Sequence, residues 1–208
     1  YLLVHEAVKK PFLDKLAEVI REFYGDDPQK SPDYTRLVNA RHHKRLCALL
    51  DSGKVFVGGQ TDVNDRYIAP TVLTDVSPDS AAMQDEIFGP ILPVLTISSL
   101  DEAVRFVNDR DKPLALYVFS NDADRAQTVI DGTSSGGGCV NDCVMHLAPH
   151  ELPFGGVGPS GMGAYHGKAS VECSTHMKGV LHTPCYLDAP LRYPPYTDDK
   201  MKWVKRLS

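Results

Sequence analysis

An acid, an aromatic residue and a tight turn stand together at Glu86, Phe88 and Gly89-Pro90. A carboxylate just before such a turn can accept two hydrogen bonds from a vicinal diol, and the aromatic side chain can then pack against a ring. An ordinary loop acid before a strand has the same local sequence, and on these residues alone it is the more common case. The segment is still the most suggestive of ligand binding in the chain.

The glycine-rich run from Gly156 to Gly161 matches the dinucleotide-binding pattern G-x-G-x-x-G letter for letter. That pattern holds a pyrophosphate when a strand leads into the glycines and a helix follows them. Here no clear strand precedes the run, no clear helix is expected after it, and Glu172 lies too near to be the acid of the pattern. We therefore predict a packing loop. A nucleophile at Ser160 is disfavoured too, because Met162 breaks the pattern G-x-S-x-G.

The cysteines and histidines near residue 140 form another set that could do chemistry. Cys139, Cys143, His146 and His150 could be metal ligands, but their spacing matches none of the usual zinc patterns, so we predict no metal site. Cys47 falls in a predicted helix and is expected in the core. A nucleophilic thiol among the other cysteines stays open, because it would need a nearby base or a helix amino terminus.

Composition limits the class of protein. The 208 residues carry 22 Lys and Arg against 27 Asp and Glu, for a formal net charge of −5, so a nucleic-acid partner is not expected. No apolar run reaches the roughly 18 residues of a membrane-spanning helix. Five scattered cysteines fit a reduced, cytoplasmic protein. The chain opens on Tyr1-Leu-Leu-Val4, an apolar strand already in progress, and we therefore expect a fragment.

Helices and strands alternate along the first two thirds of the chain. Spacing of apolar residues and end signals predict helices near 12–23, 37–50, 100–107 and 121–130, and strands near 55–57, 68–73, 91–97 and 114–119. Ser99 and Glu102 are expected to form a capping box. This alternation predicts an α/β fold with parallel pairing. A further strand is expected from Ser174 to His182, before a Pro-rich and then basic tail.

Several long segments, in order, resemble the aldehyde dehydrogenase superfamily: 67–73, 83–93, 112–120 and 133–137. The run from Leu152 to Gly163, followed by Tyr165-His-Gly-Lys168, is similar specifically to class 3, the dimeric enzymes that act on fatty and aromatic aldehydes. The resemblance extends from residue 1 to about residue 195, including Leu191-Arg-Tyr-Pro-Pro195. It implies an open catalytic-domain sheet with flanking helices, plus a dimerisation strand.

The resemblance also implies an organisation and a chemistry. Residues 1–168 would form most of the catalytic domain after the nucleophile, 169–185 the bridging strand, and 186–208 the tail. The nucleophilic Cys and the general-base Glu would lie upstream of Tyr1, so no catalytic residue is expected in this chain. With NAD or NADP, the full-length enzyme would oxidise aldehydes to acids through a thiohemiacetal and a thioester, and the fragment alone would be inactive.

Residue roles and partners follow from the same resemblance. Glu86 would hold the nicotinamide ribose and Phe88 would pack near the nicotinamide, whereas Phe154 and His166 would lie near the substrate channel. A homodimer would form through the segment from Ser174 to His182. The protein would be cytoplasmic, or bound to the endoplasmic reticulum membrane if an anchor followed residue 208. The alternative is a truncated, non-catalytic dimerisation or binding module. The preferred aldehyde and the choice between NAD and NADP stay open.

Overall fold

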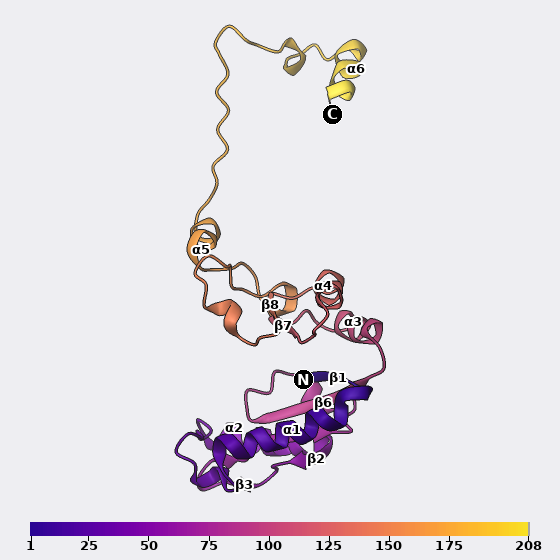
Figure 1. The fold of residues 1–208 in the computed structure, drawn as a ribbon. Coiled ribbons are helices and arrows are strands. Elements are labelled where there is room, and N and C mark those ends of the chain that lie inside the picture. Colours follow the sequence, from indigo (N-terminus) through magenta and orange to yellow (C-terminus); the bar gives the residue numbers. More distant parts are fainter. Residues whose placement is uncertain (208) are drawn as a thin grey trace.

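A four-stranded sheet forms the centre of the amino-terminal part of the chain. The computed structural model describes residues 1–207 (Figure 1). The sheet has the order β1-β6-β5-β2, in which β6 runs parallel to β1 and to β5, and β2 runs antiparallel to β5. Its strands are β1 (Leu2–His5), β2 (Lys54–Val57), β5 (Thr71–Thr74) and β6 (Ile91–Ile97). A short hairpin, β3 (Thr61–Asp62) with β4 (Tyr67–Ile68), lies beside it.

Two helices cover this sheet from opposite sides. Successive residues of a strand point to opposite faces, and β5 shows this directly. Val72 packs with Leu13 of α1 (Glu6–Tyr24), whereas Leu73 packs with Leu46 of α2 (Ala40–Cys47). Leu46 and Leu73 have no exposed surface, so α2 is tightly fixed to the sheet.

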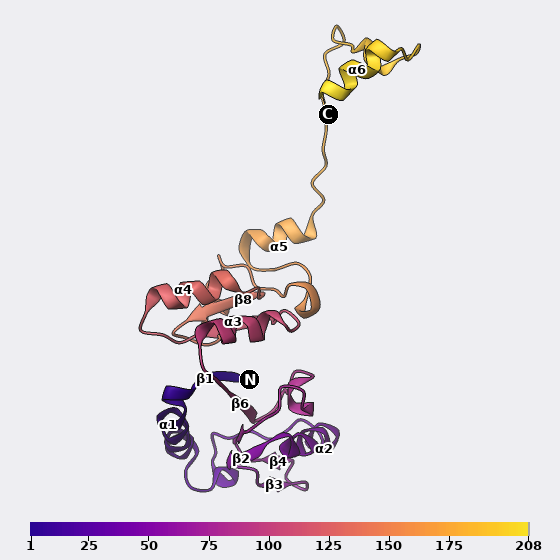
Figure 2. The same cartoon turned by 90° about the vertical axis from the view of Figure 1, so that its right-hand side faces the viewer.

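A second α/β unit follows β6 (Figure 2). Strands β7 (Ala115–Val118) and β8 (Gly137–Val140) pair in parallel, and α4 (Ala123–Gly132) connects them. Helix α3 (Leu100–Asn108) begins at Ser99, whose hydroxyl accepts the amide of Glu102. The Glu102 carboxylate accepts the hydroxyl and the amide of Ser98, which lowers its pKa. In a regular capping box the Glu102 carboxylate would accept the amide of Ser99. Here it accepts from Ser98, one residue earlier.

The remaining elements are short helices and a carboxy-terminal extension. After the glycine loop come α5 (Gly167–Ser174) and α6 (Asp198–Leu207). The 3₁₀ helices are η1 (Pro28–Lys30), η2 (Ala48–Ser52), η3 (Ala81–Met83), η4 (Met145–Leu147), η5 (Gly158–Ser160) and η6 (Pro190–Arg192). The chain beyond α5 extends away from both α/β units (Figure 1). None of the helices in residues 1–207 is long and apolar enough to cross a membrane.

The expected α/β class and the expected helices are confirmed, with several differences in detail. The predicted strand at 68–73 is divided between β4 and β5, and the antiparallel β2 departs from the expected parallel pairing. Strand β8 and the helices α5 and α6 were not expected. The strand expected from Ser174 to His182 is wrong for this single chain: Ser174 ends α5, and residues 175–184 form no strand. A strand needs a partner for its backbone groups, and this part of the chain has none.

Candidate functional site

The turn from Glu86 to Pro90 lies between η3 and β6, where the chain enters the central strand of the sheet. Phe88 adopts a left-handed backbone conformation with φ of 46°, and 77% of its surface is exposed. Glu86 is exposed as well. Both side chains are therefore available to a ligand.

Glu86 and Phe88 line one pocket with a volume of about 670 Å³. A second wall is the segment from Tyr34 to Val38, and α2 contributes His42 and Arg45. Sequence reasoning found the 86–90 side of this pocket and missed the other two sides. They lie about forty to fifty residues earlier in the chain, and only the fold brings them together.

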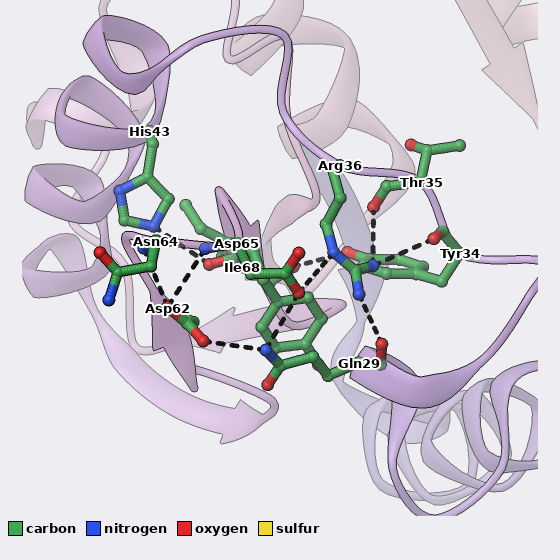
Figure 3. A network of polar contacts seen from close by, with 10 residues as sticks. Gln29, Tyr34, Thr35, Arg36, His43, Asp62, Asn64, Asp65 and Ile68 are labelled. Atoms are coloured by element: carbon green, nitrogen blue, oxygen red, sulfur yellow. Dashed lines mark hydrogen bonds and ion pairs between the residues drawn. The ribbon is translucent and has the colours of Figure 1, made fainter.

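A polar network holds the Tyr34–Val38 wall in place (Figure 3). The Nε of Arg36 donates to Asp65 at 2.7 Å, and its Nη2 donates to the carbonyl oxygen of Gln29 at 2.5 Å. The amide of Gln29 donates to Asp62 at 3.1 Å and to Asp65 at 3.0 Å. Because Asp62 and Asp65 belong to the β3–β4 hairpin region, the network joins the wall to that hairpin.

Aromatic side chains reinforce the same wall. The Tyr34 hydroxyl donates to the carbonyl oxygen of Ile68 at 2.7 Å, and the Arg36 guanidinium lies 5.1 Å from the centre of the Tyr67 ring. Burial raises the pKa of Tyr34, so its hydroxyl stays protonated and remains a donor. This side of the pocket is built as a fixed surface.

The other two predicted site residues, Phe154 and His166, lie together in a second cluster. Phe154 and Tyr165 exchange backbone hydrogen bonds of 2.9 Å in both directions, and this places His166 beside Phe154 with ring centres 6.3 Å apart. His146 packs on Phe154 at 5.7 Å and its Nδ1 lies 3.6 Å from the sulfur of Cys139. Neither Phe154 nor His166 lines the pocket of Glu86.

The glycine-rich loop is confirmed as a packing loop. A side chain at Gly155 would overlap the carbonyl oxygen of Gly163, and one at Gly156 would overlap that of Ser160. The Ser160 hydroxyl accepts the amide of Val157 and donates to its carbonyl oxygen, so it is used within the loop. Helix α5 does follow the loop, contrary to expectation, but it starts only at Gly167.

The cysteines are all unpaired. Cys47, the last residue of α2, packs against the core, as expected, and burial raises the pKa of its thiol. Burial also raises the pKa of Cys143. In residues 1–207, no group of three or more His, Cys, Asp or Glu side chains is placed to hold a metal ion.

Comparison with known protein sequences gives consistent matches. The sequence model described as the aldehyde dehydrogenase family matches residues 1–180. The chain is 51% identical over 207 residues to 4,4'-diaponeurosporen-aldehyde dehydrogenase of Staphylococcus aureus, and 48% identical over 212 residues to aldehyde dehydrogenase family 3 member A2 of the mouse. These matches cover 99% of this chain but 45% and 43% of those two proteins.

A bovine relative and two solved structures extend the comparison. The bovine protein, described as a dimeric NADP-preferring aldehyde dehydrogenase, is 47% identical over 93% of this chain and 82% of its own length. The substrate-bound state of Staphylococcus aureus AldH superposes with a TM-score of 0.83 at 51% identity, covering 100% of this chain and 45% of that one. A Pseudomonas syringae indole-3-acetaldehyde dehydrogenase variant with NAD⁺ gives a TM-score of 0.75 at 26% identity, covering 85% and 37%.

Proposed function

Because the chain belongs to the aldehyde dehydrogenase family, we propose that the protein of which it forms part oxidises aldehydes to carboxylic acids with NAD or NADP. The chain spans less than half the length of the staphylococcal and mouse relatives, so the activity is proposed for the whole protein. Relatives described with NAD⁺ and as NADP-preferring support both cofactors. The observation that carries the proposal is the meeting of Glu86 and Phe88 in one pocket.

The residues of this pocket fit one end of a dinucleotide. Small-molecule sites commonly have volumes of about 300–1,000 Å³, and this pocket falls within that range. The Glu86 carboxylate can accept two hydrogen bonds from the hydroxyls of a ribose, and the exposed Phe88 ring can pack near the nicotinamide. We assign these two contacts to Glu86 and Phe88.

The chemistry divides between this chain and the rest of the protein. When bound, NAD or NADP supplies the hydride acceptor. Glu86 orients the ribose, and Phe88 limits the positions open to the attached ring. We propose that the thiol that attacks the aldehyde, and the carboxylate that activates water for release of the acid, belong to parts of the protein outside this chain.

The aromatic cluster is proposed as a wall of the aldehyde channel. Phe154 and His166 lie side by side, and the rings of Tyr165 and His146 extend the apolar surface around them. Such a surface suits a fatty or aromatic aldehyde, in keeping with the similarity to family 3 relatives.

The limits of the domain are proposed as well. Catalytic-domain residues would end near 168, and residues 186–208 would form a separate tail.

A homodimer is proposed through the segment from Ser174 to His182. Met177 and Leu181 are 86% and 90% exposed, and the backbone there is free to add to a sheet of a second subunit. The bovine relative is described as dimeric. We also propose a cytoplasmic location, in which the five unpaired cysteines would stay reduced.

The Glu86 assignment is tested with Glu86→Gln in the whole protein. The variant keeps the size of the side chain but removes the charge that strengthens two acceptor bonds. We expect the affinity for the reduced dinucleotide to weaken roughly tenfold, with an unchanged melting temperature. The fluorescence of the dinucleotide measures the binding. Glu22→Gln, an exposed acid of α1, is the matched control. Unchanged dinucleotide affinity in Glu86→Gln would remove the assignment.

A further inference from the structure

The turn that carries Glu86 and Phe88 is held in a conformation that it would not adopt readily by itself. A left-handed backbone is uncommon for residues other than glycine and is strained for a bulky side chain at such a position. Phe88 has φ of 46°, its side chain is largely exposed, and it contributes little packing of its own. Neighbouring groups must therefore hold the turn.

Two adjacent residues of α2 supply this support. The Nη2 of Arg45 donates to the carbonyl oxygen of Ile87 at 2.6 Å, immediately before Phe88. Leu46 lies under Gly89, immediately after Phe88, where a Cβ would stand 2.5 Å from Leu46 Cδ1. The strained residue is thus held on both sides by consecutive side chains of one helix.

Helix α2 is itself well anchored, which makes it a suitable support. Its start is capped by Asn39, whose side chain accepts the amide of His42 at 2.9 Å. The buried ring of His43 contacts the carbonyl oxygen of Tyr67 at 3.1 Å. Arg45 extends from this fixed helix to the turn, and among the described residues no carboxylate lies within ion-pair distance of it.

We propose that Arg45 is a positioning residue for the dinucleotide pocket. By bonding to the carbonyl oxygen of Ile87, it holds the turn in the conformation that presents Glu86 and Phe88 to the ligand. This inference rests on the proposed function of the pocket, but it concerns the cofactor-free turn, which can be measured separately. Arg45 acts through the peptide backbone, by its bond to this carbonyl oxygen.

The test uses Arg45→Met and Arg45→Lys in the whole protein. Met keeps most of the aliphatic stem but has no donor. Lys keeps the positive charge, on an ammonium group that lacks the planar, forked donors of the guanidinium. Without cofactor, we expect amide hydrogen exchange of the segment 86–90 to rise roughly tenfold in Arg45→Met, because a partly buried bond to a charged donor is lost. The affinity for the reduced form of the dinucleotide, measured through the fluorescence of that dinucleotide, should fall by a similar factor. Lys44→Met, an exposed neighbour on α2, should change neither property.

The outcomes separate this inference from the assignment of Glu86. Faster exchange and weaker binding in Arg45→Met, partly restored in Arg45→Lys, support the positioning role. Unchanged exchange overturns it, whether binding stays the same or falls through a direct contact between Arg45 and the ligand. If exchange rises in Arg45→Met while Glu86→Gln binds normally, Arg45 holds the turn but the ribose assignment fails.

Discussion

Gly89 lies directly on the side chain of Leu46, so close that a Cβ at residue 89 would stand 2.5 Å from Leu46 Cδ1 and 2.7 Å from Cδ2. Leu46 has no exposed surface and belongs to the core cluster with Leu73 and Ile91. The turn that carries Glu86 is therefore seated on the hydrophobic core. Packing of the core and the geometry of the candidate pocket are linked at this point.

Gly89→Ala should destabilise the protein and loosen the pocket together. Leu46 cannot move away easily because it is fully enclosed, so we expect a loss of about 1–3 kcal/mol in the free energy of unfolding, as for other overpacked sites. Denaturant unfolding measures this loss, and dinucleotide binding should weaken in parallel. Lys44→Ala, at an exposed position of α2, is the control, since alanine favours a helix there. Equal stability of the two variants would contradict the seating of Gly89 on Leu46.

Arg36→Met should loosen the Tyr34–Val38 wall of the pocket. The substitution removes the bond to Asp65 and leaves the carbonyl oxygens of Gln29 and Tyr34 without this donor. Because the ion pair is partly exposed, we expect about 1–2 kcal/mol of lost stability rather than the cost of a fully buried pair. Urea unfolding measures it. Lys30→Met breaks a more exposed pair of the same segment, with Asp27, and should have almost no effect.

Tyr34 should make stability depend on pH in the alkaline range. Burial raises its pKa in the folded state above the ordinary value of 10.0. The unfolded chain then releases the Tyr34 proton first, so the free energy of unfolding is unaffected below that value and falls as the pH rises above it. Tyr34→Phe lacks this proton. We expect urea unfolding between about pH 9 and 11 to show a smaller fall in the variant than in the parent protein. Identical falls would contradict the prediction.

Ser160 should not react as a nucleophile. Its hydroxyl is engaged with both backbone groups of Val157, which stabilises the glycine loop instead of activating the oxygen. We expect no covalent labelling of Ser160 by a fluorophosphonate, followed by peptide mass spectrometry. Ser160→Ala should lose about 0.5–1.5 kcal/mol of stability for the missing hydrogen bonds. Labelling at Ser160 would contradict this prediction.

The segment from Ser174 to His182 can be tested as a dimer contact. Val180→Pro removes one backbone donor and restricts the chain, which an added strand tolerates poorly. We expect the whole protein to shift from dimer to monomer in sedimentation velocity at micromolar concentration. Asp198→Pro, which replaces the first residue of α6, should leave the dimer intact because proline is tolerated there. A dimer that persists in Val180→Pro would place the contact elsewhere.

Some elements were readable from the sequence because their signals are local. The apolar spacing of α1, the glycine after it and the Ser99 cap of α3 act within a few residues, and all three are present in the structure. Strand β8 gave no such signal: two of its four residues are glycine, and it forms because β7 provides a parallel partner. The expected strand at 174–182 failed for the converse reason. Its alternating pattern is present, but no partner strand lies in the described chain.

The candidate site divides in the same way. Glu86 and Phe88 lie two residues apart, so their residue types and the following turn were sufficient to single them out from sequence. Arg36 and Arg45 are far from them along the chain and carry no motif of their own. Their roles depend on backbone oxygens, those of Gln29 and Ile87, and a backbone acceptor has no sequence signature. Only the tertiary structure, which packs α2 and the Tyr34–Val38 segment around the turn, decides which arginines support the pocket.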